Sequence, residues 1–288
     1  MVDRWGHGAG AETLSFSKHH GAGNDFLVFV DPADRIRLPE SVVVALCDRY
    51  RGVGADGLVR VWPGEGTDLS MELHNADGGR AEMSGNGIRC VAQAAVDAGL
   101  ADPPRLTVAT DAGVRTVEYR AVGAGAGWAR VDMGPATLGE EQVSLLGQGP
   151  ARRVDVGNPH LVVLHDGVDL LDVAGLGRRI SGTVPGGLNV EFVSVVGDGD
   201  LRMRVWERGV GETRACGTGS VAAAAAARAW GLTGSVVCVQ NPGGPLEVEL
   251  GEDGAGAGAP SAWLAGPTHK VADLTADPEW LMASTEAR

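Results

Sequence analysis

The sequence has little cysteine, little positive charge and no long apolar run, and each shortage excludes a class of protein. The four cysteines show no Cys-x-x-Cys spacing, so we expect neither a disulfide framework nor a metal site. The 24 basic residues are outnumbered by 37 acidic ones, which argues against nucleic acid or an anionic membrane as a partner. No apolar run approaches the roughly 20 residues of a membrane span, and the first residues lack a hydrophobic signal core. We therefore expect a cytoplasmic protein.

Glycine, by contrast, is abundant, and part of it belongs to a turn that occurs twice. Residues 75–87 and residues 207–219 each end in Gly-x-Gly and continue into an apolar segment, and the two copies are 132 positions apart. The first copy has Ser84 where the second has Cys216. This recurrence predicts an internally duplicated protein in which each half brings one Ser-or-Cys turn to a shared site.

A second polar motif recurs at nearly the same spacing. Gly-Asn occurs at Asn24 and again at Asn158, which is 134 positions later. Two hairpin patterns with Gly/Ala tips, at residues 123–127 and 254–258, also hold matching positions in the two halves. Residues 1–13 lack any periodicity and are predicted to form a disordered tail.

Helical periodicity places two buried helices directly after the glycine turns. Residues 220–230 are apolar on almost every face, and residues 88–99 are a similar case. Residues 39–48 form a further predicted helix. Hairpins around one helix of small residues predict a sheet that wraps around that helix, because small side chains allow the strands to approach closely.

A glycine-rich turn that enters a helix can hold an anion and activate a thiol. The helix start presents unpaired N–H groups and a positive dipole end. The same field lowers the pKa of a cysteine from about 8.5 toward roughly 3.5–7.5. We therefore expect Cys216 to be a base with a lowered pKa, and Cys47, Cys90 and Cys238 to be buried core residues.

Amide side chains and one cation accompany the turns. Singly, each asparagine is typical of a turn residue that bonds its own backbone. Together they are suited to a small zwitterion, such as an amino acid. These residues are Asn24, Asn75, Asn158, Asn189 and Arg208.

These motifs resemble those of the diaminopimelate epimerases, a family of cofactor-independent amino-acid epimerases. The resemblance covers about residues 15–273, and its signatures lie at residues 18–26, 75–78, 85–89, 157–160 and 207–219. It implies an α+β fold of two pseudo-symmetric domains, each a mixed β-barrel-like sheet around a central helix. The domains would be residues 14–131 with the returning C-terminal strand 264–288, and residues 132–263.

The resemblance also implies a role for each site residue. Cys216 and the residue at position 84 would face opposite sides of the substrate's α-carbon, and His160 and Glu207 would flank them. The turn residues Gly85, Asn86, Gly217 and Thr218 would hold the α-carboxylate. Asn24, Asn75, Asn158, Asn189 and Arg208 would bind the rest of the substrate. The family implies no cofactor, a small amino acid as substrate and a homodimer.

Ser84 departs from the family, which has its first catalytic cysteine at this position. If the hydroxyl resembles water, with a pKa of about 15.7, the gap to a thiol near 8.5 is about 7 units, or roughly 10 kcal/mol. Ser84 is therefore a poor base, and an epimerisation that needs two thiols would be badly impaired.

Three interpretations of Ser84 follow. The chain is a diaminopimelate epimerase, converting the LL to the meso isomer for lysine biosynthesis, whose cysteine was replaced by design. Alternatively, it is a natural relative that uses Cys216 alone, for a double-bond shift or a dehydration in a specialised amino-acid pathway. A third interpretation is an inactive amino-acid-binding homologue. Cys216, His160 and Glu207 argue against the third, because a binding site needs no acid–base groups, and the first two stay open.

Overall fold

The computed structural model of the protein describes residues 14–142, 149–197, 199–251 and 261–286. The predicted tail and the tip at residues 254–258 lie outside the described residues. The helices are α1 (Glu40–Cys47), α2 (Gly85–Asp97), α3 (Val173–Ser181), α4 (Gly217–Ala229) and α5 (Pro278–Glu286), with a 3-10 helix η1 (Val168–Leu170). The strands are β1 (Ser15–Gly21), β2 (Asn24–Val30), β3 (Gly57–Pro63), β4 (Leu69–Asn75), β5 (Arg80–Ala81), β6 (Arg105–Thr110), β7 (Gly113–Gly123), β8 (Ala126–Pro135), β9 (Thr137–Gln142), β10 (Ala151–Asp155), β11 (Pro159–Leu164), β12 (Asn189–Val196), β13 (Asp200–Glu207), β14 (Gly211–Thr213), β15 (Val236–Asn241), β16 (Gly244–Leu250) and β17 (Ser261–Thr275).

Strand pairing repeats along the chain, which confirms the predicted duplication. In the first half, β2 pairs with β3 in parallel, β3 with β4 antiparallel, and β4 with β6 in parallel. The antiparallel pairs β6–β7 and β7–β8 follow. In the second half, β11, β12, β13, β15, β16 and β17 pair in the same order and the same directions. The fold is therefore α+β with two pseudo-symmetric halves, as the sequence predicted.

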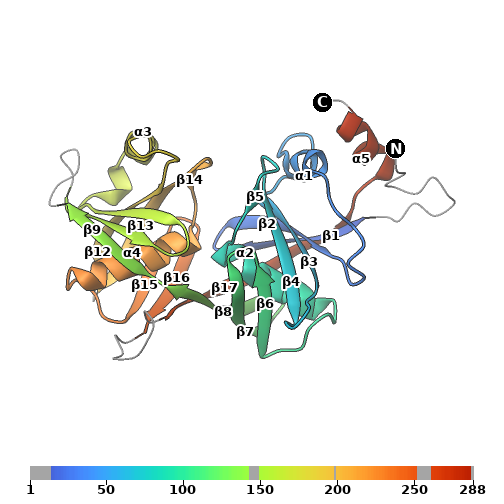
Figure 1. Ribbon diagram of the computed structural model, residues 1–288, viewed down its shortest axis with the longest axis horizontal. Coiled ribbons are helices and arrows are strands. Elements are labelled where there is room, and N and C mark those ends of the chain that lie inside the picture. Colours follow the sequence, from blue (N-terminus) through green and yellow to red (C-terminus); the bar gives the residue numbers. More distant parts are fainter. Residues whose placement is uncertain (1–13, 143–148, 198, 252–260, 287–288) are drawn as a thin grey trace.

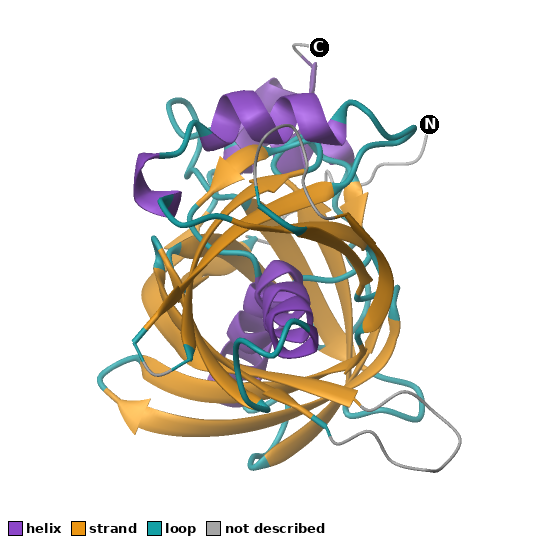
Figure 2. Ribbon diagram, turned by 90° about the vertical axis from the view of Figure 1, so that its left-hand side faces the viewer, coloured by secondary structure: helices purple, strands orange, loops and turns teal. Residues whose placement is uncertain are grey.

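One helix runs through the middle of each curved sheet, α2 in the first half and α4 in the second (Figure 2). α4 is buried at every position from Gly217 to Ala227, and its small side chains let the strands close around it. Both helices begin three residues before the predicted apolar segments. The reason is that Ser84 and Cys216 act as their N-caps, so that the glycines of each turn are already helical.

Two long stretches of strand connect the halves (Figure 1). β8 pairs with β7 of the first half, and β9, which follows it, pairs with β10 of the second. β17 starts beside β16 in the second half and ends beside β1 in the first. β8 and β17 also pair with each other. The expected domain limits at 131/132 and 263/264 fall within these two strands and stay a prediction.

The remaining α-helices lie outside the two barrels. α1 and α5 pack together on the first half, where Val42 and Leu46 of α1 are buried. α3 covers the second half through Val173 and Ile180. α1 confirms the helix predicted for residues 39–48. None of the helices in the described ranges has the length and apolar character needed to cross a membrane.

Candidate active site between the two halves

Ser84 and Cys216 hold equivalent positions at the starts of α2 and α4. Ser84 has φ −135° and ψ 122°, and Cys216 has φ −125° and ψ 121°. Ser84 Oγ accepts a hydrogen bond from Gly87 N at 3.0 Å. Likewise, Cys216 Sγ accepts one from Gly219 N at 3.4 Å. The same backbone geometry therefore presents a hydroxyl in one half and a thiol in the other.

The two helix starts touch because a glycine follows each cap. A Cβ atom on Gly217 would lie 3.0 Å from Gly85 Cα and 2.9 Å from Leu264 Cδ2. A Cβ atom on Gly85 would lie 2.6 Å from the same Leu264 atom. Without these side chains, the unpaired N–H groups and positive dipole ends of both helices meet. An anion at this junction would interact with both helices at once.

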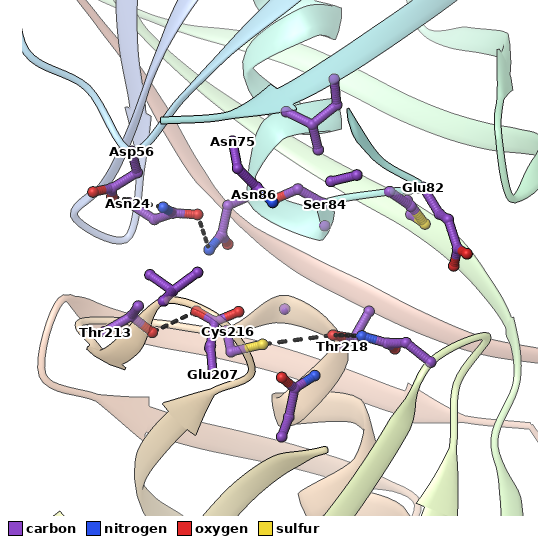
Figure 3. A pocket seen from close by; sticks show the side chains of 18 of the residues that line it. Asn24, Asp56, Asn75, Glu82, Ser84, Asn86, Glu207, Thr213, Cys216 and Thr218 are labelled. Carbon is purple, nitrogen blue, oxygen red and sulfur yellow. Dashed lines mark hydrogen bonds between the residues drawn. The ribbon is translucent and has the colours of Figure 1, made fainter. Parts of the chain in front are cut away.

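A cavity of about 250 Å³ lies at this junction. Figure 3 shows Asn75 and Ser84 on one side of it and Glu207 and Cys216 on the other. Among the residues predicted from the sequence, His160 does not line the cavity. The predicted residues that do line it are Asn24, Asn75, Ser84, Gly85 and Asn86 of the first half, and Asn158, Asn189, Glu207, Arg208, Cys216, Gly217 and Thr218 of the second.

Asn86 joins the two turns. Its Nδ2 donates to Asn24 Oδ1 at 3.1 Å and to the carbonyl oxygen of Ala215, the residue before Cys216, at 3.3 Å. Asn24 Nδ2 in turn donates to Asp56 Oδ2 at 2.7 Å. Asp56 lines the cavity although it was not predicted as a site residue. The amides therefore hold the turns together as well as facing the cavity.

The rim of the cavity carries charged groups that the sequence analysis did not select. Arg80 and Glu82 line it and belong to the first turn segment. Arg80 also forms an ion pair with Asp111 at 2.9 Å. On the opposite side, Arg208 is exposed, and its backbone N donates to Asn189 Oδ1 at 2.8 Å. Arg80 and Glu82 lie inside the repeated turn, and this place in the sequence is the signal that could have identified them.

Cys216 is surrounded by acid–base groups. Glu207 accepts a hydrogen bond from Thr213 Oγ1 at 2.5 Å, and its charge acts on the Cys216 thiol. Thr218 Oγ1 lies 3.5 Å from Cys216 Sγ. Burial raises the pKa of the Glu207 carboxyl above its ordinary value. The carboxyl next to the thiol is therefore a stronger proton acceptor than an ordinary glutamate.

The lowered pKa expected for Cys216 is wrong in this structure. Burial, followed by the charges of Glu207 and Glu191, raises the pKa of the Cys216 thiol well above its ordinary value. Hydrogen bonds from Thr218 and Gly219 act in the opposite direction but are smaller effects. The helix start alone does not decide the state of the thiol, because desolvation and two carboxylates oppose it.

Burial also disfavours the thiolate form of the other cysteines. Burial raises the pKa of Cys47 to about 12 and that of Cys90 to about 11. Cys238, which we expected to be buried, is only half-buried, and desolvation raises its pKa as well.

We expect Cys216 to react slowly with iodoacetamide at pH 7 and to speed up only when the pH is well above about 8.5, the pKa of a free thiol. Glu207→Gln removes one of the two nearby charges, so it should lower the thiol pKa and speed the labelling at pH 8. Mass spectrometry would follow each cysteine, with half-buried Cys238 as the internal reference. Fast labelling of Cys216 at pH 7 in the unmodified protein would contradict this assignment.

His160 lies behind the cavity in a buried pair with Glu191. His160 Nδ1 is 2.7 Å from Glu191 Oε1, and His160 Nε2 is 2.9 Å from Asn158 Oδ1. Both side chains of the pair are fully buried. The sequence analysis missed Glu191, and the available signal was an acidic residue within the apolar strand β12, two positions after Asn189.

The two halves differ in chemistry at their equivalent positions. In the first half, Phe26 pairs with Gly57 in the parallel strand pair. In the second half, His160 pairs with Asn189 at the equivalent position. Every acid–base group around Cys216 is replaced by an apolar or amide side chain around Ser84. The equivalent positions are Phe26 and His160, Val59 and Glu191, Asn75 and Glu207, Ala81 and Thr213, and Ser84 and Cys216.

Metal ligands do not gather around this cavity. Within the described ranges, no group of three or more His, Cys, Asp or Glu side chains is placed to hold a metal ion. The groups that face or flank the cavity are the thiol, the carboxyls, the hydroxyls, the amides and the helix N–H groups already described.

Solved structures with low sequence identity share this fold. A phenazine biosynthesis protein of Bacillus anthracis has a TM-score of 0.74 at 15% identity, over 92% of this chain and 99% of that one. A probable proline racemase of Agrobacterium radiobacter has a TM-score of 0.71 at 20% identity, over 94% and 96%. These structures share the fold of this chain, and the isomerase class itself rests on the family that the sequence matches.

The chain belongs to the diaminopimelate epimerase family, whose model matches residues 16–139 and 152–263. A diaminopimelate epimerase of Corynebacterium glutamicum is 42% identical over 268 residues, which is 88% of this chain and 97% of that protein. One of Desulfitobacterium hafniense is 42% identical over 262 residues, or 83% and 92%. One of Rhodococcus erythropolis is 39% identical over 292 residues, or 93% and 98%.

Proposed function

We propose that this isomerase moves a proton at an α-carbon of diaminopimelate and that Cys216 is its working acid–base group. The observation that carries the proposal is the pocket itself, in which two equivalent helix caps face each other, while the positions around Ser84 that are equivalent to Glu207, His160 and Glu191 hold no acid–base group. The family membership supports diaminopimelate as the substrate.

The α-carboxylate would bind where α2 and α4 meet. The N–H groups of Gly85, Asn86, Gly217 and Thr218 are the donors available at these helix starts. They would stabilise the negative charge that develops on the carboxylate when the α-proton leaves. Asn75, Asn158, Asn189 and Arg208 would bind the distal amino-acid end.

The proton transfer would start from the thiol. Glu207, which lines the same cavity as Cys216 and whose carboxyl pKa is raised by burial, would take its proton. The thiolate would then remove the α-proton, and the electrons of the broken C–H bond would move into the carboxylate-stabilised carbanion. Return of a proton from Cys216 restores the original configuration, whereas delivery from the Ser84 side inverts it.

Ser84 supports a second candidate function, a one-base isomerisation. Asn75, Phe26 and Val59 stand at the positions that Glu207, His160 and Glu191 hold in the other half, so Ser84 lacks the acid–base groups that accompany Cys216. Such a site would favour reactions that end on the face where they began, such as a double-bond shift or a dehydration on a related amino acid. An inactive binding protein is a weaker candidate, because binding alone does not explain a buried thiol that shares the cavity with Glu207.

The substrate is tested by proton NMR in D₂O with the LL, meso and DD isomers of diaminopimelate and with L-lysine, which lacks the distal carboxylate. We expect loss of an α-proton signal from diaminopimelate and none from L-lysine. If no diaminopimelate isomer exchanges or binds, the substrate lies elsewhere and the one-base alternative is favoured.

A further inference from the structure

Glu191 is a carboxylate in an energetically unfavourable position. It lies in the middle of the second barrel on β12, with no exposed surface. Its Oε1 meets His160, but its Oε2 has no hydrogen-bond partner among the described residues. A buried carboxylate with an unsatisfied oxygen costs free energy. The packing of the strand alone does not account for this residue.

The equivalent pair of the first half shows that the fold does not need it. There, the strand positions of His160 and Glu191 are occupied by Phe26 and Val59, and both are buried. The same barrel therefore closes around an apolar pair. The polar pair occurs in the half that carries Cys216.

A chain of hydrogen bonds leads from Glu191 to the thiol. Glu191 meets His160 at 2.7 Å, and His160 meets Asn158 at 2.9 Å. Asn158 Nδ2 donates to Thr218 Oγ1 at 3.5 Å, and Thr218 Oγ1 lies 3.5 Å from Cys216 Sγ. Figure 3 shows the last links on the Cys216 side of the pocket.

The chemistry of the partners decides where the imidazole proton lies. A carboxylate only accepts, so His160 Nδ1 must carry a proton toward Glu191. A doubly protonated ring also donates from Nε2, which suits the amide oxygen of Asn158. A neutral ring with its proton on Nδ1 would need the amide of Asn158 reversed, which would break the bond from Asn158 Nδ2 to Thr218. The observed contacts therefore require both ring nitrogens to donate, Nδ1 to Glu191 and Nε2 to Asn158 Oδ1.

The orientation of Asn158 then determines which hydrogen bond the Cys216 thiol receives. With its amide oxygen toward His160, its amide nitrogen donates to Thr218. Because the Thr218 oxygen is then an acceptor from Asn158, its own proton is free to point at Cys216 Sγ. A donor to sulfur favours the thiolate.

We propose that Glu191 is a positioning residue of the proton-transfer site, which holds His160 with both ring nitrogens donating and so, through Asn158 and Thr218, aligns the hydrogen bond to Cys216. The kinetic consequence rests on the proposed function, whereas the protons on the ring do not.

The test combines ¹⁵N NMR of histidine-labelled protein with the rate of α-proton exchange. The variants are Glu191→Gln, which keeps an acceptor oxygen, Glu191→Val, and the double variant His160→Phe with Glu191→Val, which copies the pair of the first half. Glu247→Gln, an exposed carboxylate on β16, is the matched control. The double variant also identifies the His160 signals by their loss.

We expect both ring nitrogens of His160 to carry a proton in the unmodified protein and in the control. In Glu191→Val we expect only one ring proton, which leaves Asn158 free to reverse. We also expect the exchange rate to fall in the order unmodified, Glu191→Gln, Glu191→Val, with a loss in kcat of at least about tenfold for valine. The double variant should fold and lose at least as much, so it decides the kinetic part if Glu191→Val is unstable.

A His160 ring with a single proton in the unmodified protein would overturn the proposal, and so would an unchanged exchange rate in the double variant. If the unmodified enzyme exchanges no diaminopimelate, the proposed function fails, but the NMR result still decides the role of Glu191.

Discussion

Replacing Ser84 with cysteine is expected to raise the rate of inversion of diaminopimelate by about 10²–10⁴-fold, the range that a positioned acid–base group contributes. The substituted thiol would stand on a helix cap with the backbone geometry of Cys216. It would be more acidic than the hydroxyl by about 7 pKa units. Conversion of the LL to the meso isomer, followed by chiral chromatography, measures the effect.

Ser84→Ala is the matched control for this substitution, because it removes the hydroxyl and adds no thiol. We expect it to invert diaminopimelate no faster than the unmodified protein. If Ser84→Cys stays inactive on every diaminopimelate isomer, the scaffold is not an epimerase with a replaced cysteine. The one-base alternative would then account for the site better.

Cys216→Ser is expected to lower α-proton exchange by about 10²–10⁴-fold, because it leaves a hydroxyl on both faces of the substrate. The fold should tolerate the change, since serine is a favoured N-cap residue and already caps α2. Proton NMR in D₂O measures the exchange rate of the variant. Cys238→Ser, a substitution of the half-buried cysteine in the same half, should leave it unchanged.

A Cys216→Ser variant that exchanges at the original rate would remove Cys216 from the reaction. Thermal unfolding of the variant separates this outcome from loss of structure. A folded but inactive variant supports the assigned role.

The duplication and the position of the pocket could be predicted from the sequence because both depend on local signals. Glycines next to Ser84 and Cys216 mark helix starts, and a fixed offset between the two copies implies equivalent places in the fold. The structure places the caps at these positions and brings their glycines into contact. The amides of Asn24 and Asn158 follow the same repeat.

The surroundings of the thiol could not be predicted in the same way. Glu191 reaches His160 because β11 and β12 pair in parallel, and that register is a property of the folded sheet. The pKa of Cys216 depends on how deeply the thiol is buried and on which carboxylates come near it. The turn sequence predicts the helix start, but it predicts neither the burial of the thiol nor the nearby carboxylates.

The central claim is that proton transfer is one-sided, with Cys216 active and Ser84 nearly inert. Its most direct test is the ratio of solvent deuterium exchange to inversion at the α-carbon of diaminopimelate in the unmodified enzyme. We predict that exchange with retained configuration exceeds inversion by at least about 10²-fold. Equal rates of exchange and inversion, at an ordinary turnover of about 10 per second, would contradict it.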